Sequence, residues 1–229
     1  DEDRAKSDMA YGNIALSIAT YEASPEVNAF SSKYDLTYTG KVKLTKQERR
    51  GFALFRGKGM CHRCHISNDT EALFTDYTFD NLGTPKNPDN PVYDNHPDFV
   101  DSGLGGFLKN AGYPEDVYMA EWGKQKVPTL RNVDLRPAED FVKAYGHNGY
   151  FKSLEGIVHF YNTRDVKPSC ESLGILDATE EDALANDCWP EPEVTDNVNT
   201  EELGNLGLTP EEEAAIVAFM KALSDGYQP

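Results

Sequence analysis

Five consecutive residues, Cys61-His62-Arg63-Cys64-His65, combine side-chain types and a spacing that suit one kind of chemistry. A Cys-x-x-Cys-His sequence is the attachment signal for a c-type haem. Two thiols three positions apart can form thioethers to the two vinyl groups on one edge of a porphyrin, and the histidine that follows can then bind the iron. The motif therefore predicts one covalent haem c, attached through Cys61 and Cys64, with His65 as the proximal ligand.

Two other uses of a Cys-x-x-Cys pair fit the sequence less well. A zinc site would need a second ligand pair, and the remaining cysteines, Cys170 and Cys188, lack that spacing. A thioredoxin-type motif would need a βαβ context, which is missing here. In an oxidising compartment Cys170 and Cys188 are expected to form a disulfide, which would stabilise the fold by about 3 kcal/mol.

Composition limits the class of protein and of partner. The chain has 229 residues, enough for one large domain or one domain with an appendage, and its formal net charge is -17. Such a surface argues against nucleic acid and anionic membranes and favours a basic partner protein. No apolar run reaches the length of a membrane span. Because haem c is attached outside the cytoplasm, we expect a mature, processed chain that is periplasmic or otherwise exported.

Helical patterns flank the attachment motif and would position it. An apolar face predicts a helix over residues 8–23, and residues 25–44 look like a connector with extended pieces. Thr45 and Glu48 form a capping box for a helix that breaks at Gly57 and Gly59, just before the motif. Later helices are predicted over 115–122, after Ser153, and after the capping box of Thr209 and Glu212.

The remaining segments lack a clear helical period. Residues 66–114 read as a long irregular loop whose aromatic residues either cover a haem edge or only fix the loop. Residues 165–204 read as an acidic insertion that the cysteine pair would staple. The expected fold is mainly α: a cytochrome c-like haem domain with long irregular loops and this acidic, disulfide-stapled insertion.

The order of these features resembles the C-terminal haem domain of the bacterial di-haem cytochrome c peroxidase and MauG family. The matching stretches are residues 18–22, 44–55, 61–65, 74–76, 81–83, 126–132, 147–149, 154–162 and 208–212. The resemblance implies a haem domain over 45–229, preceded by an N-terminal helix and connector over 1–44 that is a remnant of the family's first domain. Family members carry two haems, whereas this sequence has one attachment motif.

The resemblance also suggests further haem contacts. Peroxidases of the family place a methionine ligand fourteen residues beyond the histidine of a His-x-Gly motif, and MauG-like members have tyrosine there. His147 matches that histidine, so Tyr161 is the expected second iron ligand, with a core tyrosine as the alternative. His147 is expected to support the site without binding iron, although ligand and propionate partner stay open. Arg131, in the matching stretch 126–132, is predicted to contact the cofactor. Met60, Met119 and His159 are weaker ligand candidates.

Two classes of function follow. The preferred one is a haem c electron-transfer protein, an oxidoreductase or its electron-relay part, that relays or stores oxidising equivalents through a His/Tyr-ligated haem. The alternative is a peroxidase in which this haem itself reduces hydrogen peroxide. That reading needs an acid/base residue on a free side of the haem, and the family's distal glutamate belongs to the N-terminal domain. The expected partners are a basic redox protein and, as a further candidate, a second haem-bearing chain.

Overall fold

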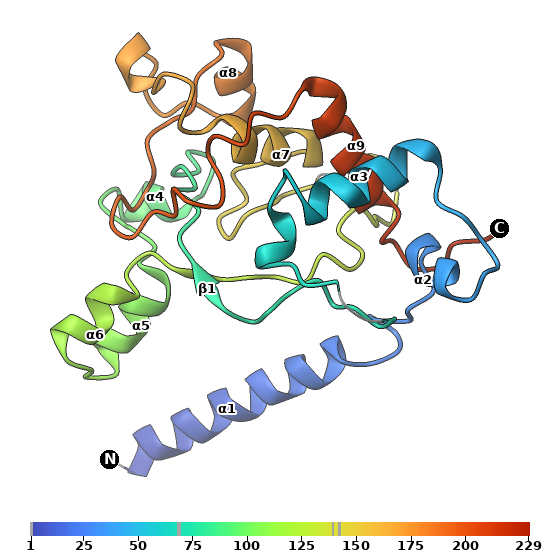
Figure 1. Ribbon diagram of the computed structural model, residues 1–229. Coiled ribbons are helices and arrows are strands. Elements are labelled where there is room, and N and C mark those ends of the chain that lie inside the picture. The colour runs from blue at the N-terminus through green and yellow to red at the C-terminus, as the bar shows by residue number, and fades with distance from the viewer. Residues whose placement is uncertain (1, 68–69, 139, 142) are drawn as a thin grey trace.

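The computed structural model describes residues 2–67, 70–138, 140–141 and 143–229, and it confirms a mainly helical chain (Figure 1). The elements in chain order are α1 (Glu2–Glu22), α2 (Lys33–Tyr38), α3 (Lys46–Arg56), η1 (Cys61–Arg63), β1 (Phe79–Asp80), α4 (Val92–Asn95), α5 (Gly103–Asn110), α6 (Glu115–Ala120), β2 (Gln125–Lys126), α7 (Leu154–Thr163), η2 (Glu171–Leu173), α8 (Glu180–Ala185) and α9 (Pro210–Lys221). In the described residues no helix is both long enough and apolar enough to traverse a bilayer.

Helices α3, α7 and α9 surround the main hydrophobic core, and Figure 1 shows α3 crossing α9 closely. Each begins at the N-cap that the sequence predicts, and the capping boxes of α3 and α9 are both formed. Gly51 permits the close crossing, because a Cβ atom there would collide with the Ala215 carbonyl and lie 2.9 Å from Phe219 Cβ. The core residues include Phe55, Phe74, Leu154, Val158, Ile216, Phe219 and Leu223.

The predicted helix over 8–23 is confirmed as α1, although it begins earlier, at Glu2. None of its residues is buried, and Figure 1 shows it lying apart from the core helices. Its apolar side chains are therefore exposed: Met9, Tyr11, Ile14, Leu16, Ile18 and Tyr21. The next segment differs from the expected extended connector, because Ser32 caps α2 through a capping box with Asp35.

The segment 66–114 is more regular than its sequence pattern indicates. Strand β1 pairs antiparallel with β2, with Phe79 opposite Lys126, and α5 packs on α6. Helix α5 contains three glycines, which have low helix propensity and hide it from a sequence-based prediction. Gly105 is required there, because a Cβ atom would lie 2.5 Å from Trp122 Cα. Tertiary packing therefore overrides local preference in this hairpin.

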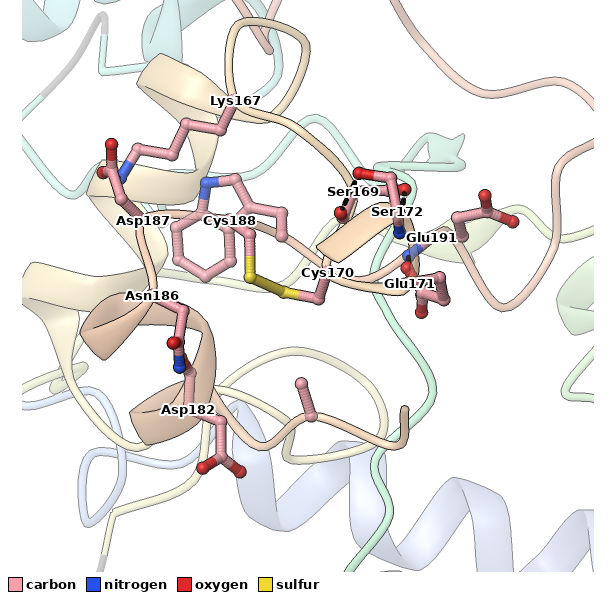
Figure 2. Close-up of a disulfide and its surroundings, with 12 residues drawn as sticks. Lys167, Ser169, Cys170, Glu171, Ser172, Asp182, Asn186, Asp187, Cys188 and Glu191 are labelled. Carbon is pink, nitrogen blue, oxygen red and sulfur yellow. Dashed lines mark hydrogen bonds and ion pairs between the residues drawn. A yellow bond between two sulfur atoms is a disulfide. The ribbon is translucent and has the colours of Figure 1, made fainter. Parts of the chain in front are cut away.

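The predicted disulfide between Cys170 and Cys188 is confirmed, with an S–S distance of 2.05 Å (Figure 2). Both cysteines are fully buried in a second core cluster that also contains Phe160 and Trp189. Lys167 forms an ion pair with Asp187 beside the bridge. The segment 165–204, expected to be irregular, contains η2 and α8.

Candidate haem site

The attachment motif follows α3 through a four-residue link that ends in a tight turn. Met60 adopts a left-handed conformation with φ 56°, which reverses the chain into η1. A side chain at Gly59 would crowd Leu54 O and Ile216 Cδ1, at 3.0 and 2.9 Å. This link therefore places Cys61 directly against the core formed by α3 and α9.

Cys61, Cys64 and His65 line one cavity of about 480 Å³. That volume lies within the range of about 300–1,000 Å³ typical of sites for small molecules and cofactors. Most of the wall is apolar, as an iron porphyrin requires, and it is formed by residues that include Leu130, Ile157, Val158, Leu206, Ile216 and Met220. The cavity thus joins α7, α9 and the link before η1 around the motif.

The two thiols of the motif are free and are not joined to each other. Burial raises the pKa of Cys61 and of Cys64 to about 12, and the Glu202 carboxylate adds to the effect at Cys64. In the described residues, Cys64 Sγ also lies within 4.8 Å of carboxylate oxygens of Asp80 and Glu202. This group contains neither Cys61 nor His65, so it does not correspond to a Cys-x-x-Cys zinc site.

His65 is held in the orientation that a metal ligand needs. Its Nδ1 atom donates a hydrogen bond of 2.7 Å to the Phe74 carbonyl, so Nε2 is the ring nitrogen that would bind a metal. Burial lowers the pKa of His65, so the ring is kept neutral, as coordination requires. The Phe74 residue that supplies this carbonyl has a left-handed backbone conformation, with φ 55°. The chain therefore fits a haem on two thioethers and one imidazole.

Tyr161 lies on α7 and lines the same cavity as His65. Burial is the main cause that raises the pKa of its hydroxyl, and the Cys61 and Cys64 thiols contribute. The geometry therefore places the two predicted ligands in the wall of one cavity.

His147 also lines the cavity, in a turn between Tyr145 and Phe151. Its Nε2 atom faces two carboxylates, Glu193 Oε2 at 3.8 Å and Asp101 Oδ2 at 3.9 Å. These partners are 46 and 46 positions away along the chain, on opposite sides of His147, so no local pattern indicates them.

Arg131 is not among the residues that line the cavity. Its guanidinium is buried and binds Asp35 through two hydrogen bonds of 3.0 and 2.7 Å, and Asp225 through a third of 2.9 Å. The predicted cofactor contact therefore has no geometric support here. Arg131 instead joins α2, the stretch 126–132 and the C-terminal segment.

Of the three weaker ligand candidates, one lines the cavity and two do not. Met60 lines the cavity, whereas Met119 is exposed and His159 binds Glu213 through Nδ1 at 3.0 Å. The aromatic residues expected from the segment 66–114 do not reach the cavity wall: Tyr77, Phe79, Tyr93, Phe99 and Phe107. The segment instead contributes residues that the sequence-based prediction did not single out as site residues, among them Asp80 and Thr84.

Asp80 and Glu202 form a polar wall beside Cys64. Asn199 Nδ2 donates hydrogen bonds to both carboxylates, at 2.5 Å to Asp80 and 3.0 Å to Glu202. Arg63 pairs with Glu202 at 3.2 Å on the exposed side. Asn199 is 119 positions from Asp80 and 3 from Glu202, so only the folded chain brings the two carboxylates together.

Comparisons with known proteins agree with this geometry. No protein-family model matches the chain. It is 31% identical to the methylamine utilization protein MauG of Paracoccus denitrificans (strain Pd 1222) over 230 residues, covering 97% of this chain and 54% of that protein. It is 27% identical to cytochrome-c peroxidase IdrP1 of Denitromonas iodatirespirans, covering 90% of this chain and 48% of that protein.

The fold matches as well. The crystal structure of the diheme peroxidase BthA from Burkholderia thailandensis E264 superposes with a TM-score of 0.67 at 30% sequence identity, covering 89% of this chain and 48% of that one. The chain therefore spans about half the length of the relatives that it matches. Sequence, fold and site together show that the chain belongs to the di-haem cytochrome c peroxidase/MauG family.

Proposed function

We propose that this chain is a haem c electron-transfer protein that relays or stores oxidising equivalents through one haem with His65 and Tyr161 as iron ligands. A haem-based redox or peroxidase role follows from the family. The observation that carries the finer proposal is the shared cavity, which is lined by both thiols of the motif, His65 and Tyr161. In this reading residues 45–229 are the haem domain and residues 1–44 precede it.

The residues around the cavity would tune such a centre toward its oxidised form. When bound, the haem supplies one-electron transfer at its iron. The Phe74 carbonyl holds the His65 ring in place, and a Tyr161 oxygen in its anionic form would favour the ferric state, in contrast to a methionine sulfur. Asp80 and Glu202 add negative charge beside Cys64 and act in the same direction.

The surface and the disulfide suggest where the chain works and what it meets. A net charge of -17 favours a basic redox partner, whose approach the acidic surface would steer. Haem c attachment and the Cys170–Cys188 bridge both fit a periplasmic or otherwise exported protein. Because the BthA structure is that of a diheme peroxidase of about twice the length, a second haem-bearing segment or chain is a further proposed partner.

The haem content is tested first. A pyridine haemochrome assay of the purified chain should give one haem per chain with the band position of two thioethers. Replacing both Cys61 and Cys64 with alanine should abolish covalent attachment. Zero haem in the wild-type chain, or attachment that survives in the double variant, would contradict the proposal.

The ligand assignment is tested by Tyr161→Phe, with Tyr145→Phe as the matched control. Tyr145 lines the same cavity, but its hydroxyl is hydrogen-bonded to the Val133 carbonyl at 3.2 Å. Tyr161→Phe should change the ferric absorption and spin state and raise the reduction potential, because it removes the oxygen ligand. Tyr145→Phe should change neither. An unchanged spectrum and potential in Tyr161→Phe would show that Tyr161 only packs.

A peroxidase reading has one observation in its favour: His147, an acid/base group, lines the cavity. The electron-transfer proposal predicts that the haem-loaded chain does not turn over hydrogen peroxide with a small-molecule electron donor. Steady turnover that His147→Gln abolishes would replace the proposal with the peroxidase reading.

A further inference from the structure

A buried carboxylate joins the haem cavity to the protein surface. The Glu193 side chain is 5% exposed, and its Oε2 atom faces Nε2 of His147, which lines the cavity. On its other side Glu193 lines a separate pocket of about 420 Å³, together with the exposed residues Asp98 and Phe99. Glu193 therefore lies between the solvent side and the imidazole at the cavity wall.

The groups around Glu193 keep it ionised. Tyr93 of α4 donates a hydrogen bond of 2.7 Å to Oε1, and the Asp101 amide donates one of 3.3 Å to the same atom. Burial raises the pKa of Glu193, but the nearby His147 imidazole, 3.8 Å away, and the hydrogen bond from Tyr93 outweigh it and hold that pKa below its ordinary value. Glu193 therefore presents a carboxylate to the His147 imidazole.

Charged groups face the cluster from each neighbouring element. Asp101 precedes α5, and its carboxylate is 41% exposed and 3.9 Å from His147 Nε2. Lys86 Nζ lies 4.0 Å from the centre of the Tyr93 ring, and Asp98 and Glu191 line the outer pocket with Glu193. His147, 21% exposed, is the residue that meets both the carboxylates and the cavity.

The turn that carries His147 is fixed from both sides. Asn148 Nδ2 donates to the Pro85 carbonyl at 2.7 Å, and Asn87 Nδ2 donates to the Asn148 carbonyl at 2.9 Å. Gly146 provides the positive φ of 78° that the turn requires. The imidazole therefore has a defined place between the carboxylates and the cavity.

We propose that His147, supported by Glu193 and Asp101, binds one proton when the haem in this cavity is reduced by one electron and releases it on reoxidation. The proposal rests on the proposed redox function of the same cavity. An electron from a one-electron donor enters the site, and one proton passes from solvent, past Asp101 and Glu193, to His147 Nε2. Reduction removes one positive charge from the iron, so a cationic imidazole nearby becomes more favourable, and by linkage protonation favours reduction equally.

The test is the reduction potential of the haem-loaded full chain as a function of pH, measured by spectroelectrochemistry. One proton per electron means a tenfold change in the reduction equilibrium per pH unit, or about 59 mV, with the potential rising as the pH falls. The sloping region should lie within about pH 5 to 8, where histidine side chains titrate. His147→Gln should remove the slope. A pH-independent wild-type potential would overturn the proposal.

His159→Gln is the matched control, because His159 also pairs with a glutamate, is 28% exposed, and does not line the cavity. It should keep the slope. A slope that persists in His147→Gln would place the proton elsewhere, the haem propionates included, and would overturn the proposal.

Glu193→Gln gives an independent variant, since it keeps an acceptor for Tyr93 but removes the charge that stabilises a cationic His147. It should move the sloping region to lower pH, and an unmoved region would also overturn the proposal. NMR titration of His147 should show tighter proton binding in the reduced chain, by the factor that the slope implies. A chain that takes up no haem would refute the proposed function, whereas normal, pH-independent reduction would refute only this inference.

Discussion

The buried cluster of Arg131, Asp35 and Asp225 makes the sharpest prediction about stability. The Arg131 side chain is 1% exposed, and those of Asp35 and Asp225 are 5% and 10% exposed. Three hydrogen bonds join the guanidinium to the two carboxylates, and Asp225 also accepts the Ser31 amide at 2.6 Å. Arg131→Met would keep much of the side-chain volume and leave two buried carboxylates without their cation.

Removing one partner of a buried ion pair costs about 3–5 kcal/mol, because an uncompensated charge stays buried. We therefore expect Arg131→Met to lower the free energy of unfolding by that amount, measured by urea denaturation at constant m. Lys221→Met is the control: its pair with Glu155 has the same kind of contact, 2.9 Å, but is 45% and 61% exposed. Exposed pairs of this kind contribute about 0–1 kcal/mol.

The haem spectrum and reduction potential distinguish this role from the cofactor contact that the sequence indicates. If Arg131 only stabilises the fold, both stay unchanged in Arg131→Met while stability falls. A loss no larger than that of Lys221→Met would refute the energetic reasoning. A changed potential with unchanged stability would return Arg131 to the cofactor.

Three further changes have expected outcomes. Replacing Cys170 and Cys188 with serine should lower the free energy of unfolding by about 3 kcal/mol, because the bridge closes a loop with a sequence separation of 18. The reduced wild-type chain should have the same free energy of unfolding as the double variant. Gly51→Ala should lower the free energy of unfolding by about 1–3 kcal/mol through the clash at the α3–α9 crossing, measured by urea denaturation, whereas Gly12, where a Cβ atom meets nothing, should tolerate alanine. Burial raises the pKa of Glu180 above its ordinary value of 4.5, so the folded chain binds that proton more tightly than the unfolded chain does. The free energy of unfolding should therefore fall as the pH rises from the ordinary pKa of glutamate to the raised one. Glu180→Gln should weaken this fall, and an unchanged pH profile of unfolding would contradict the prediction.

The elements that the sequence predicts best are those with local signals. Thr45, Ser153 and Thr209 begin helices because a side-chain oxygen and an amide two or three residues later suffice to form a cap. The attachment motif is equally local, and the disulfide follows from two remaining cysteines. The caps and the motif depend on neighbours in the chain, and the disulfide on the number of cysteines, so a single sequence reveals them.

The features that it misses depend on distant partners. Helix α5 forms on glycine-rich residues because Gly105 packs on Trp122. Arg131 belongs to an ion-pair cluster because folding brings Asp35 and Asp225 to it, 96 and 94 positions away. Membership of the matching stretch 126–132 cannot distinguish such a cluster from a cofactor contact, since an arginine could serve either purpose.

Helix α7 explains how the disulfide-bridged segment and the haem cavity depend on each other. Phe160 is buried in the second cluster, with its ring 5.2 Å from that of Trp189, beside Cys188. The next residue, Tyr161, lines the cavity, and Ile157 packs against both core clusters. Because interiors are close-packed, a shift of Phe160 must move Tyr161 with it. Loss of the bridge should therefore shift Tyr161, the proposed iron ligand, in addition to lowering the free energy of unfolding.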